Sequence, residues 1–165
     1  MLRKVFIGLG IVLIIIQFFR PEKNESNERT YDVSTKYEVP DDVNQLLQVA
    51  CKDCHSNKTE YPWYANVQPV AWWLNDHVID GKKHLNFSTF VKMPIAIQNH
   101  KFEETIEMVE EKEMPLPSYT NFGLHKEANL TEEQRQKIIV WAQDQMTYLK
   151  ENYPADSLVM PKRRQ

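Results

Sequence analysis

Two cysteines and a histidine in the run Cys51-Lys52-Asp53-Cys54-His55 form the most informative pattern in this chain of 165 residues. Their spacing is that of a CxxCH motif, the attachment sequence for c-type haem. Two thiols three positions apart can add to the two vinyl groups of one porphyrin, and the histidine that follows can then bind the iron. The chain contains no other cysteine, so no thiol remains for a disulfide framework or for a four-cysteine zinc or iron–sulfur site. The motif therefore predicts one covalently attached haem c, held by Cys51 and Cys54, with His55 as an iron ligand.

Three other uses of the same residues have to be weighed. A thioredoxin-like redox pair is expected within a βαβ pattern, and the flanking sequence shows none. A zinc site with two cysteines and one histidine would need a fourth ligand or an open position. The remaining alternative is a pair of structural cysteines followed by a chance histidine. The segment that precedes the motif favours haem attachment over all three.

That segment begins with the basic residues Arg3 and Lys4 and continues with an apolar run from Val5 to Phe19, interrupted by Gln17. A basic start before an apolar core is typical of an export signal, and no small-residue cleavage site follows it. We therefore predict that residues 1–20 form an uncleaved signal anchor with a single transmembrane helix, whose short length is offset by snorkelling basic side chains. The positive-inside tendency then places the haem domain on the periplasmic face of the cell inner (cytoplasmic) membrane. In that compartment, paired thiols are normally oxidised or receive a cofactor.

The rest of the chain divides by composition. Residues 21–39 are polar, lack an apolar period and are predicted to be a linker. Residues 40–153 are predicted to form one small domain, and residues 154–165 a disordered tail. The net charge of −3 is too small to identify a partner by electrostatic steering. The basic residues are scattered among acidic ones, so nothing suggests nucleic-acid binding.

The domain is predicted to be all-α, with the architecture of a small cytochrome c-like helical domain. An apolar face with helical spacing leads directly into Cys51 and consists of Val43, Leu46, Leu47 and Ala50. Further helices are expected over about residues 69–79, with Gly81 as a stop signal, and over about 101–111. A last helix begins at the capping-box pattern from Thr131 to Gln134 and continues to Leu149. No alternating strand pattern competes with these helices.

The second axial position of the iron decides what chemistry is available. Met114 is followed by Pro115, Leu116 and Pro117, and the two prolines predict a stiff loop that can hold a thioether in place at little entropic cost. Methionines within helices are more often core residues. We therefore predict Met114 as the distal ligand. The other methionines and histidines considered are Met93, Met108, Met146, His77, His84, His100 and His125.

Three separated runs, Cys51 to Tyr64, Gly81 to Ser88 and Met114 to Tyr119, resemble the haem-binding domain family of cytochrome c-like proteins. The helix over residues 130–142 is similar too, and the resemblance covers roughly residues 41–143. It implies a monohaem domain of exported bacterial proteins with CxxCH and a downstream methionine as ligands. Carried over to this chain, it implies attachment at Cys51 and Cys54, His55 as the proximal ligand and Met114 as the distal one. The segment from residue 89 to residue 101 matches none of these runs.

A haem with histidine and methionine ligands has both axial positions filled, which predicts one-electron transfer rather than enzymatic catalysis. The expected partners are redox proteins or a membrane electron-transfer chain. One alternative is a sensor of haem ligands or redox state with a displaceable Met114. Another is a peroxidase-like enzyme with an open sixth position and His77 or His84 as the distal acid–base residue. Several aromatic residues are candidates for lining the porphyrin: Trp63, Tyr64, Trp72, Trp73, Tyr119 and Trp141.

Overall fold

The computed structural model describes residues 1–121 and 125–160, and this part of the chain contains helices and no strand. This result confirms the all-α prediction. The α-helices are α1 (Leu2–Ile16), α2 (Asp41–Ala50), α3 (Lys52–His55), α4 (Val70–His84), α5 (Ile95–Glu110), α6 (Pro117–Thr120) and α7 (Glu132–Asn152). Between and after them lie the 3-10 turns η1 (Val33–Thr35), η2 (Trp63–Asn66), η3 (Phe87–Lys92), η5 (Lys126–Ala128) and η6 (Ala155–Leu158).

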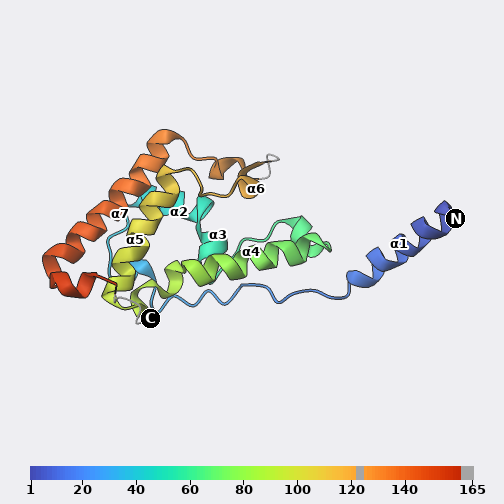
Figure 1. Cartoon of the computed structure of the whole chain (residues 1–165), viewed down its shortest axis with the longest axis horizontal. Coiled ribbons are helices and arrows are strands. Elements are labelled where there is room, and N and C mark those ends of the chain that lie inside the picture. Colours follow the sequence, from blue (N-terminus) through green and yellow to red (C-terminus); the bar gives the residue numbers. More distant parts are fainter. Residues whose placement is uncertain (122–124, 161–165) are drawn as a thin grey trace.

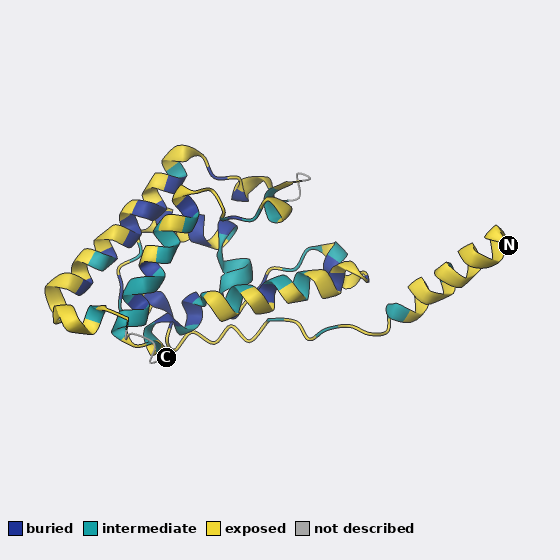
Figure 2. Ribbon diagram, viewed as in Figure 1, coloured by how far each residue is buried: buried dark blue, intermediate teal, exposed yellow. Residues whose placement is uncertain are grey.

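The long helices α5 and α7 pack side by side and form one wall of the domain (Figure 1). Helix α2 packs on α7, and the short helix α3 packs on α2 and on α4. Helix α3 therefore lies between the α5–α7 pair and α4. Helix α1 projects away from this assembly, and almost all of its residues are exposed (Figure 2).

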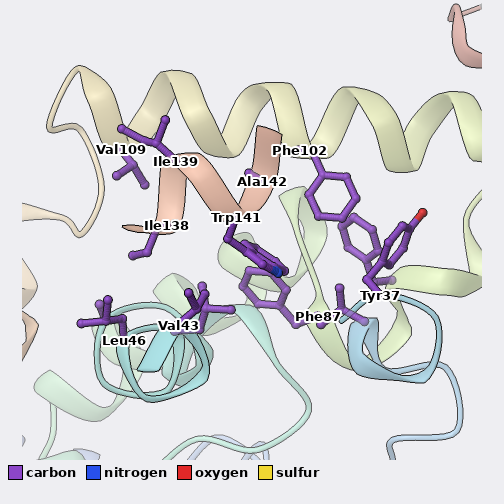
Figure 3. Packing of buried hydrophobic residues seen from close by; sticks show 14 of the residues in the cluster. Tyr37, Val43, Leu46, Phe87, Phe102, Val109, Ile138, Ile139, Trp141 and Ala142 are labelled. Carbon is purple, nitrogen blue, oxygen red and sulfur yellow. The ribbon is translucent and has the colours of Figure 1, made fainter. Parts of the chain in front are cut away.

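Aromatic side chains fill the centre of the domain. Trp141 of α7 packs edge to face against Phe102 of α5, with 5.6 Å between ring centroids (Figure 3). Phe102 in turn contacts Phe90 and Tyr37 at 4.8 and 5.0 Å. Such geometries add to the stabilisation that the buried area alone provides. The core thus joins α5, α7 and η3, and the α2–α3 connection lies at its edge.

The core also extends N-terminal to residue 40, where the domain was expected to begin. Val33 and Tyr37 are 1% and 2% exposed, and the Tyr37 hydroxyl donates a hydrogen bond to Gln98 Oε1 at 2.5 Å. The indole of Trp141 donates to the carbonyl of Glu38 at 2.9 Å. The division into residues 21–39 and 40–153 remains a prediction, but part of the expected linker is packed into the domain.

Earlier in the same polar segment, Asn24 is hydrogen-bonded to the loop that follows α3. Its amide nitrogen donates to the Ser56 carbonyl at 2.8 Å and to Thr59 Oγ1 at 2.9 Å. Its backbone N–H donates to the Tyr61 hydroxyl at 2.9 Å, and its side-chain oxygen accepts from Lys82 Nζ at 2.6 Å. One asparagine therefore fixes the segment beside the CxxCH region.

The prediction of a transmembrane helix over residues 1–20 is not supported. Helix α1 has 15 residues, about 22 Å at 1.5 Å per residue, against a hydrocarbon core of about 30 Å. The helix ends at Ile16, and the Gln17 side chain pairs with the backbone of Gln68, accepting from its N–H at 2.9 Å and donating to its carbonyl at 3.2 Å. Within residues 1–121 and 125–160, no helix combines the length and the apolar character needed to cross a membrane.

The C-terminal segment, predicted to be disordered over residues 154–165, begins with η6. Leu158 of this turn packs against the core, and its carbonyl accepts from the Asn99 side chain at 3.4 Å. Residues 161–165 lie outside the described part of the chain. The first part of the expected tail is therefore ordered on the domain.

Candidate functional site

The CxxCH motif forms one helical turn that begins where α2 ends. Cys51 leaves the helical conformation at φ −129° and ψ −47°, while its N–H still donates to the Leu47 carbonyl at 3.0 Å. Its own carbonyl accepts from the N–H groups of Cys54 at 3.2 Å and His55 at 2.9 Å. Residues three apart on such a turn lie on the same side of it. The turn therefore presents the two free thiols together, with the imidazole of His55 next in sequence.

The imidazole of His55 is fixed by a backbone carbonyl. Its Nδ1 lies 3.0 Å from the Leu85 oxygen, directly after α4. Because a carbonyl can only accept, Nδ1 carries the proton, and Nε2 is the ring nitrogen left with a lone pair that can bind a metal. Burial lowers the pKa of His55, which favours the neutral ring that metal ligation requires. This oriented histidine is the clearest functional feature of the site.

The two thiols differ from those of redox-active CxxC proteins. Burial raises the pKa of Cys51 to about 12 and the pKa of Cys54 to about 11, so both thiols are protonated at neutral pH. Redox-active pairs instead depend on a thiol whose pKa is lowered. Across the described residues, no three or more histidine, cysteine or acidic side chains are grouped so as to hold a metal ion. The raised pKa of both thiols is unlike the lowered pKa of a redox-active pair.

Gly81 allows α4 to approach this turn closely. A Cβ at position 81 would lie 2.6 Å from the Cys54 carbonyl oxygen and 3.0 Å from Cys54 Cβ. The neighbouring atoms belong to the backbone of the motif or lie next to it, and cannot move aside without displacing α3. The absence of a side chain at Gly81 therefore sets the spacing between α3 and α4.

We expect Gly81→Ala to lower the free energy of unfolding by about 1–3 kcal/mol, the usual cost of overpacking. Urea unfolding followed by circular dichroism measures this change. Gly8→Ala is the matched control, because nothing lies within 4 Å of a Cβ at that position, and it should change the stability by less than about 0.5 kcal/mol. An unchanged urea midpoint for Gly81→Ala would show that α3 and α4 are not this close.

Met114 lies in the predicted loop between α5 and α6, and its backbone is held on both sides. Its N–H donates to the Met108 carbonyl at 3.0 Å, and its carbonyl accepts from Arg135 Nη1 at 2.7 Å. Arg135 of α7 is only 8% exposed and also donates to the Val109 carbonyl at 3.1 Å. Burying a guanidinium is costly unless it is hydrogen-bonded, and here its bonds fix the end of α5 and the start of the loop. The sequence indicated a stiff loop but not the arginine that anchors it.

Four of the competing ligand candidates, two methionines and two histidines, make contacts of their own. Met93 and Met146 both pack against the hydrophobic core. Among the histidines, the Nδ1 of His77 is bonded to the carbonyl of Trp73 on its own helix at 2.9 Å. His100 lies 3.2 Å from carboxylate oxygens of both Glu103 and Glu104. None of these four residues is linked to the CxxCH turn by a hydrogen bond among the described contacts.

Two hydrogen bonds connect the CxxCH region with the segment that follows Met114. The Tyr119 hydroxyl donates to Asp53 Oδ2 at 2.6 Å. The Tyr64 hydroxyl lies 3.0 Å from His125 Nε2, and the rings of Tyr119 and His125 are stacked with centroids 4.1 Å apart. Burial, followed by the hydrogen bond to Asp53, raises the pKa of Tyr119, so its hydroxyl remains a donor. No motif or periodicity indicated that Asp53, the second variable position of the motif, is bonded to this tyrosine.

The aromatic residues expected beside a porphyrin fall into two groups. Trp141 is 3% exposed and belongs to the hydrophobic core. Trp63 is 77% exposed on η2, and Trp72 and Trp73 are exposed on α4, the helix that packs on α3. A groove of about 580 Å³ between α2 and α7 is lined by core-edge residues such as Val140 and does not include the motif. Of these exposed indoles, those of Trp72 and Trp73 lie on a helix that packs on the CxxCH turn.

These residues fit a haem. The thiols of Cys51 and Cys54 lie on one turn, and His55 keeps Nε2 as its metal-binding nitrogen. The Met114 thioether is carried by a residue whose backbone is fixed by hydrogen bonds. Thiol, imidazole and thioether groups are the protein groups that hold haem iron and its porphyrin in c-type cytochromes.

The sequence profile of the haem-binding domain family matches residues 11–144. The match covers most of the chain, which therefore belongs to the haem-binding domain family, and the protein binds haem. No curated protein and no solved structure gives a match.

Proposed function

We propose that the protein attaches one haem c through Cys51 and Cys54, binds its iron with His55 and Met114, and transfers single electrons. The observation that carries the proposal is the His55 imidazole, held through Nδ1 by the Leu85 carbonyl, on the turn that also carries two free thiols. A haem bound here supplies a one-electron redox couple, and methionine ligation favours its reduced state. The chain's own residues orient the ligands and exclude water from them.

Electron transfer is favoured over peroxidase chemistry by the contacts of the candidate acid–base histidines and of Met114. A peroxidase needs an open sixth position and a nearby acid–base side chain. His77 has its Nδ1 engaged by the Trp73 carbonyl, and His84 is exposed at the end of α4. Met114, in contrast, has both backbone polar groups bonded, as suits a ligand that closes the position. The protein is therefore proposed to be an electron carrier and not an enzyme.

The proposed place of action is outside the cytoplasm. The basic start and the exposed apolar residues of α1 are typical of an export signal, and unpaired thiols in an exported protein call for a cofactor or a disulfide. The expected partners are redox proteins of the same compartment.

A haem-based sensor is the second candidate, because Met114 lies in a loop and not within a helix. In such a sensor, an external ligand would displace the thioether while His55 and the two thioether links remained in place. The two functions differ in how firmly the Met114 loop is held.

Visible spectra of the protein, produced in cells that mature c-type cytochromes, test the proposal. An electron carrier should show sharp ferrous bands and the weak long-wavelength ferric band of an iron–methionine bond, with no shift on addition of carbon monoxide. A clear carbon monoxide shift would favour the sensor or the peroxidase. Absence of haem from the denatured polypeptide in a haem stain would overturn covalent attachment.

A further inference from the structure

We infer that the hydrogen bond between Tyr119 and Asp53 positions the Met114 loop against the CxxCH turn and thereby sets how easily Met114 leaves the iron. This inference rests on the proposed function, since it concerns the proposed distal ligand. Asp53 lies between the two attachment cysteines, and Tyr119 is in α6, five residues after Met114. The bond therefore joins the CxxCH turn directly to the segment that follows Met114.

Asp53 is a well-fixed acceptor. Its Oδ1 accepts from the Glu60 N–H at 2.9 Å, and its backbone carbonyl accepts from Thr59 Oγ1 at 2.6 Å. Its Oδ2 is thus held in position for the Tyr119 hydroxyl at 2.6 Å. A short bond to a carboxylate is roughly twice as strong as a neutral one. The carboxylate is part of the motif turn. The bond therefore fixes Tyr119 relative to the same turn that carries His55.

The bond matters because α6 has little other connection to α3. Among the described elements, α6 packs on η5, whereas α3 packs on α2, α4 and η3. The connection between α6 and the motif therefore depends on the side-chain bond from Tyr119 to Asp53, while the Tyr64–His125 bond joins η2 to the residue before η5.

The loop is held at Met114 itself and again five residues later. Arg135 bonds the carbonyl of Met114 itself, and Tyr119 bonds the motif five residues later. Fixing a loop at two points lowers the entropy that its ligand loses on binding. Removing one of these two contacts should leave Met114 bound less firmly, so that an external ligand competes more successfully for the iron.

Tyr119→Phe tests this inference in the haem-loaded protein, because it removes the hydroxyl and keeps the ring that stacks on His125. The first measurement is the apparent dissociation constant of imidazole for the ferric protein, followed as loss of the iron–methionine band. We expect imidazole to bind about tenfold more tightly to the variant, as follows from the loss of one hydrogen bond to a charged group. The second measurement is amide hydrogen exchange over residues 114–121, which should become faster in the variant.

Tyr61→Phe is the matched control. Its hydroxyl accepts from the Asn24 N–H at 2.9 Å and so ties the N-terminal segment, not the Met114 loop, to the domain. It should leave imidazole binding unchanged. In an Asp53→Ala background, Tyr119→Phe should have no further effect, because both substitutions remove the same bond.

The outcomes separate this inference from the proposed function. If the unsubstituted protein lacks the iron–methionine band, the proposed ligation by Met114 fails. If that band is present and Tyr119→Phe binds imidazole as the unsubstituted protein does, the positioning role of Tyr119 is overturned. The positioning role would also be overturned if Tyr61→Phe strengthened imidazole binding as much as Tyr119→Phe does. The change in affinity would then not depend on the contact between Tyr119 and Asp53.

Discussion

Replacing Cys51 and Cys54 together with alanine is expected to abolish covalent haem. The chain has no other cysteine, so no thiol remains to form a thioether. The helical turn should survive, because its hydrogen bonds run from the carbonyl of residue 51 to the N–H groups of residues 54 and 55 and do not use the thiols. Mass spectrometry of the denatured polypeptide should show that the mass of one haem is missing.

The single variants Cys51→Ala and Cys54→Ala are the comparison for this result. Each keeps one thiol beside an intact His55 and should retain some covalent haem at reduced yield. Far-ultraviolet circular dichroism of the double variant should show the helical content of the unsubstituted chain. Covalent haem in the double variant would show that attachment does not take place at the CxxCH motif.

Met114→Ala is expected to open the sixth position while leaving the haem attached. The hydrogen bonds that fix the loop at this residue join backbone atoms of Met114 to Met108 and Arg135, so the substitution removes the thioether without removing the support of the loop. The ferric iron–methionine band should disappear, and the ferrous protein should bind carbon monoxide. The reduction potential should fall, because methionine ligation favours the ferrous state.

Met93→Ala is the control for this variant. Met93 packs against the hydrophobic core, so its truncation should lower the free energy of unfolding by up to about 2–5 kcal/mol and leave the spectrum unchanged. The reverse pattern, with the band lost in Met93→Ala and kept in Met114→Ala, would identify Met93 as the ligand.

The helices that sequence periodicity predicted best are those whose start and apolar face are encoded locally. Helix α2 carries the expected buried residues and leads into Cys51. Helix α7 begins with the expected capping box, in which Thr131 Oγ1 accepts from the Gln134 N–H and the Gln134 side chain accepts from the Thr131 N–H. Both signals act within one or two turns, so the sequence alone suffices to read them.

The predictions were wrong where a residue served a distant contact. Gly81 was expected to stop a helix, but α4 continues to His84. The glycine instead serves a distant contact, since its missing side chain leaves room for the Cys54 carbonyl. Helix α5 begins at Ile95, six residues before the expected start, and its buried Gln98 bonds Tyr37 from the expected linker. Neither contact leaves a local periodic signal.

In the candidate site, too, locally encoded features were predicted and distant contacts were not. The motif specifies the thiols and the histidine by type and spacing, and the two prolines after Met114 indicate a stiff loop. The residues that hold these groups come from elsewhere: Leu85 lies 30 positions from His55, and Tyr119 lies 66 positions from Asp53. Such pairings depend on how α3, α4 and α6 are arranged in three dimensions, which residue types and spacing do not specify.

The Leu85 carbonyl that holds His55 affects both what a mutational screen can detect and how much negative charge the imidazole ring carries. A main-chain oxygen persists whatever amino acid occupies position 85, so a saturation screen of side chains would pass over the group that selects the ring tautomer. Being uncharged, this oxygen pulls on the Nδ1 proton less than a carboxylate would, and the ring keeps little imidazolate character. If His55 binds the haem iron as proposed, its electron donation would be kept weak by a main-chain group that no side-chain substitution removes.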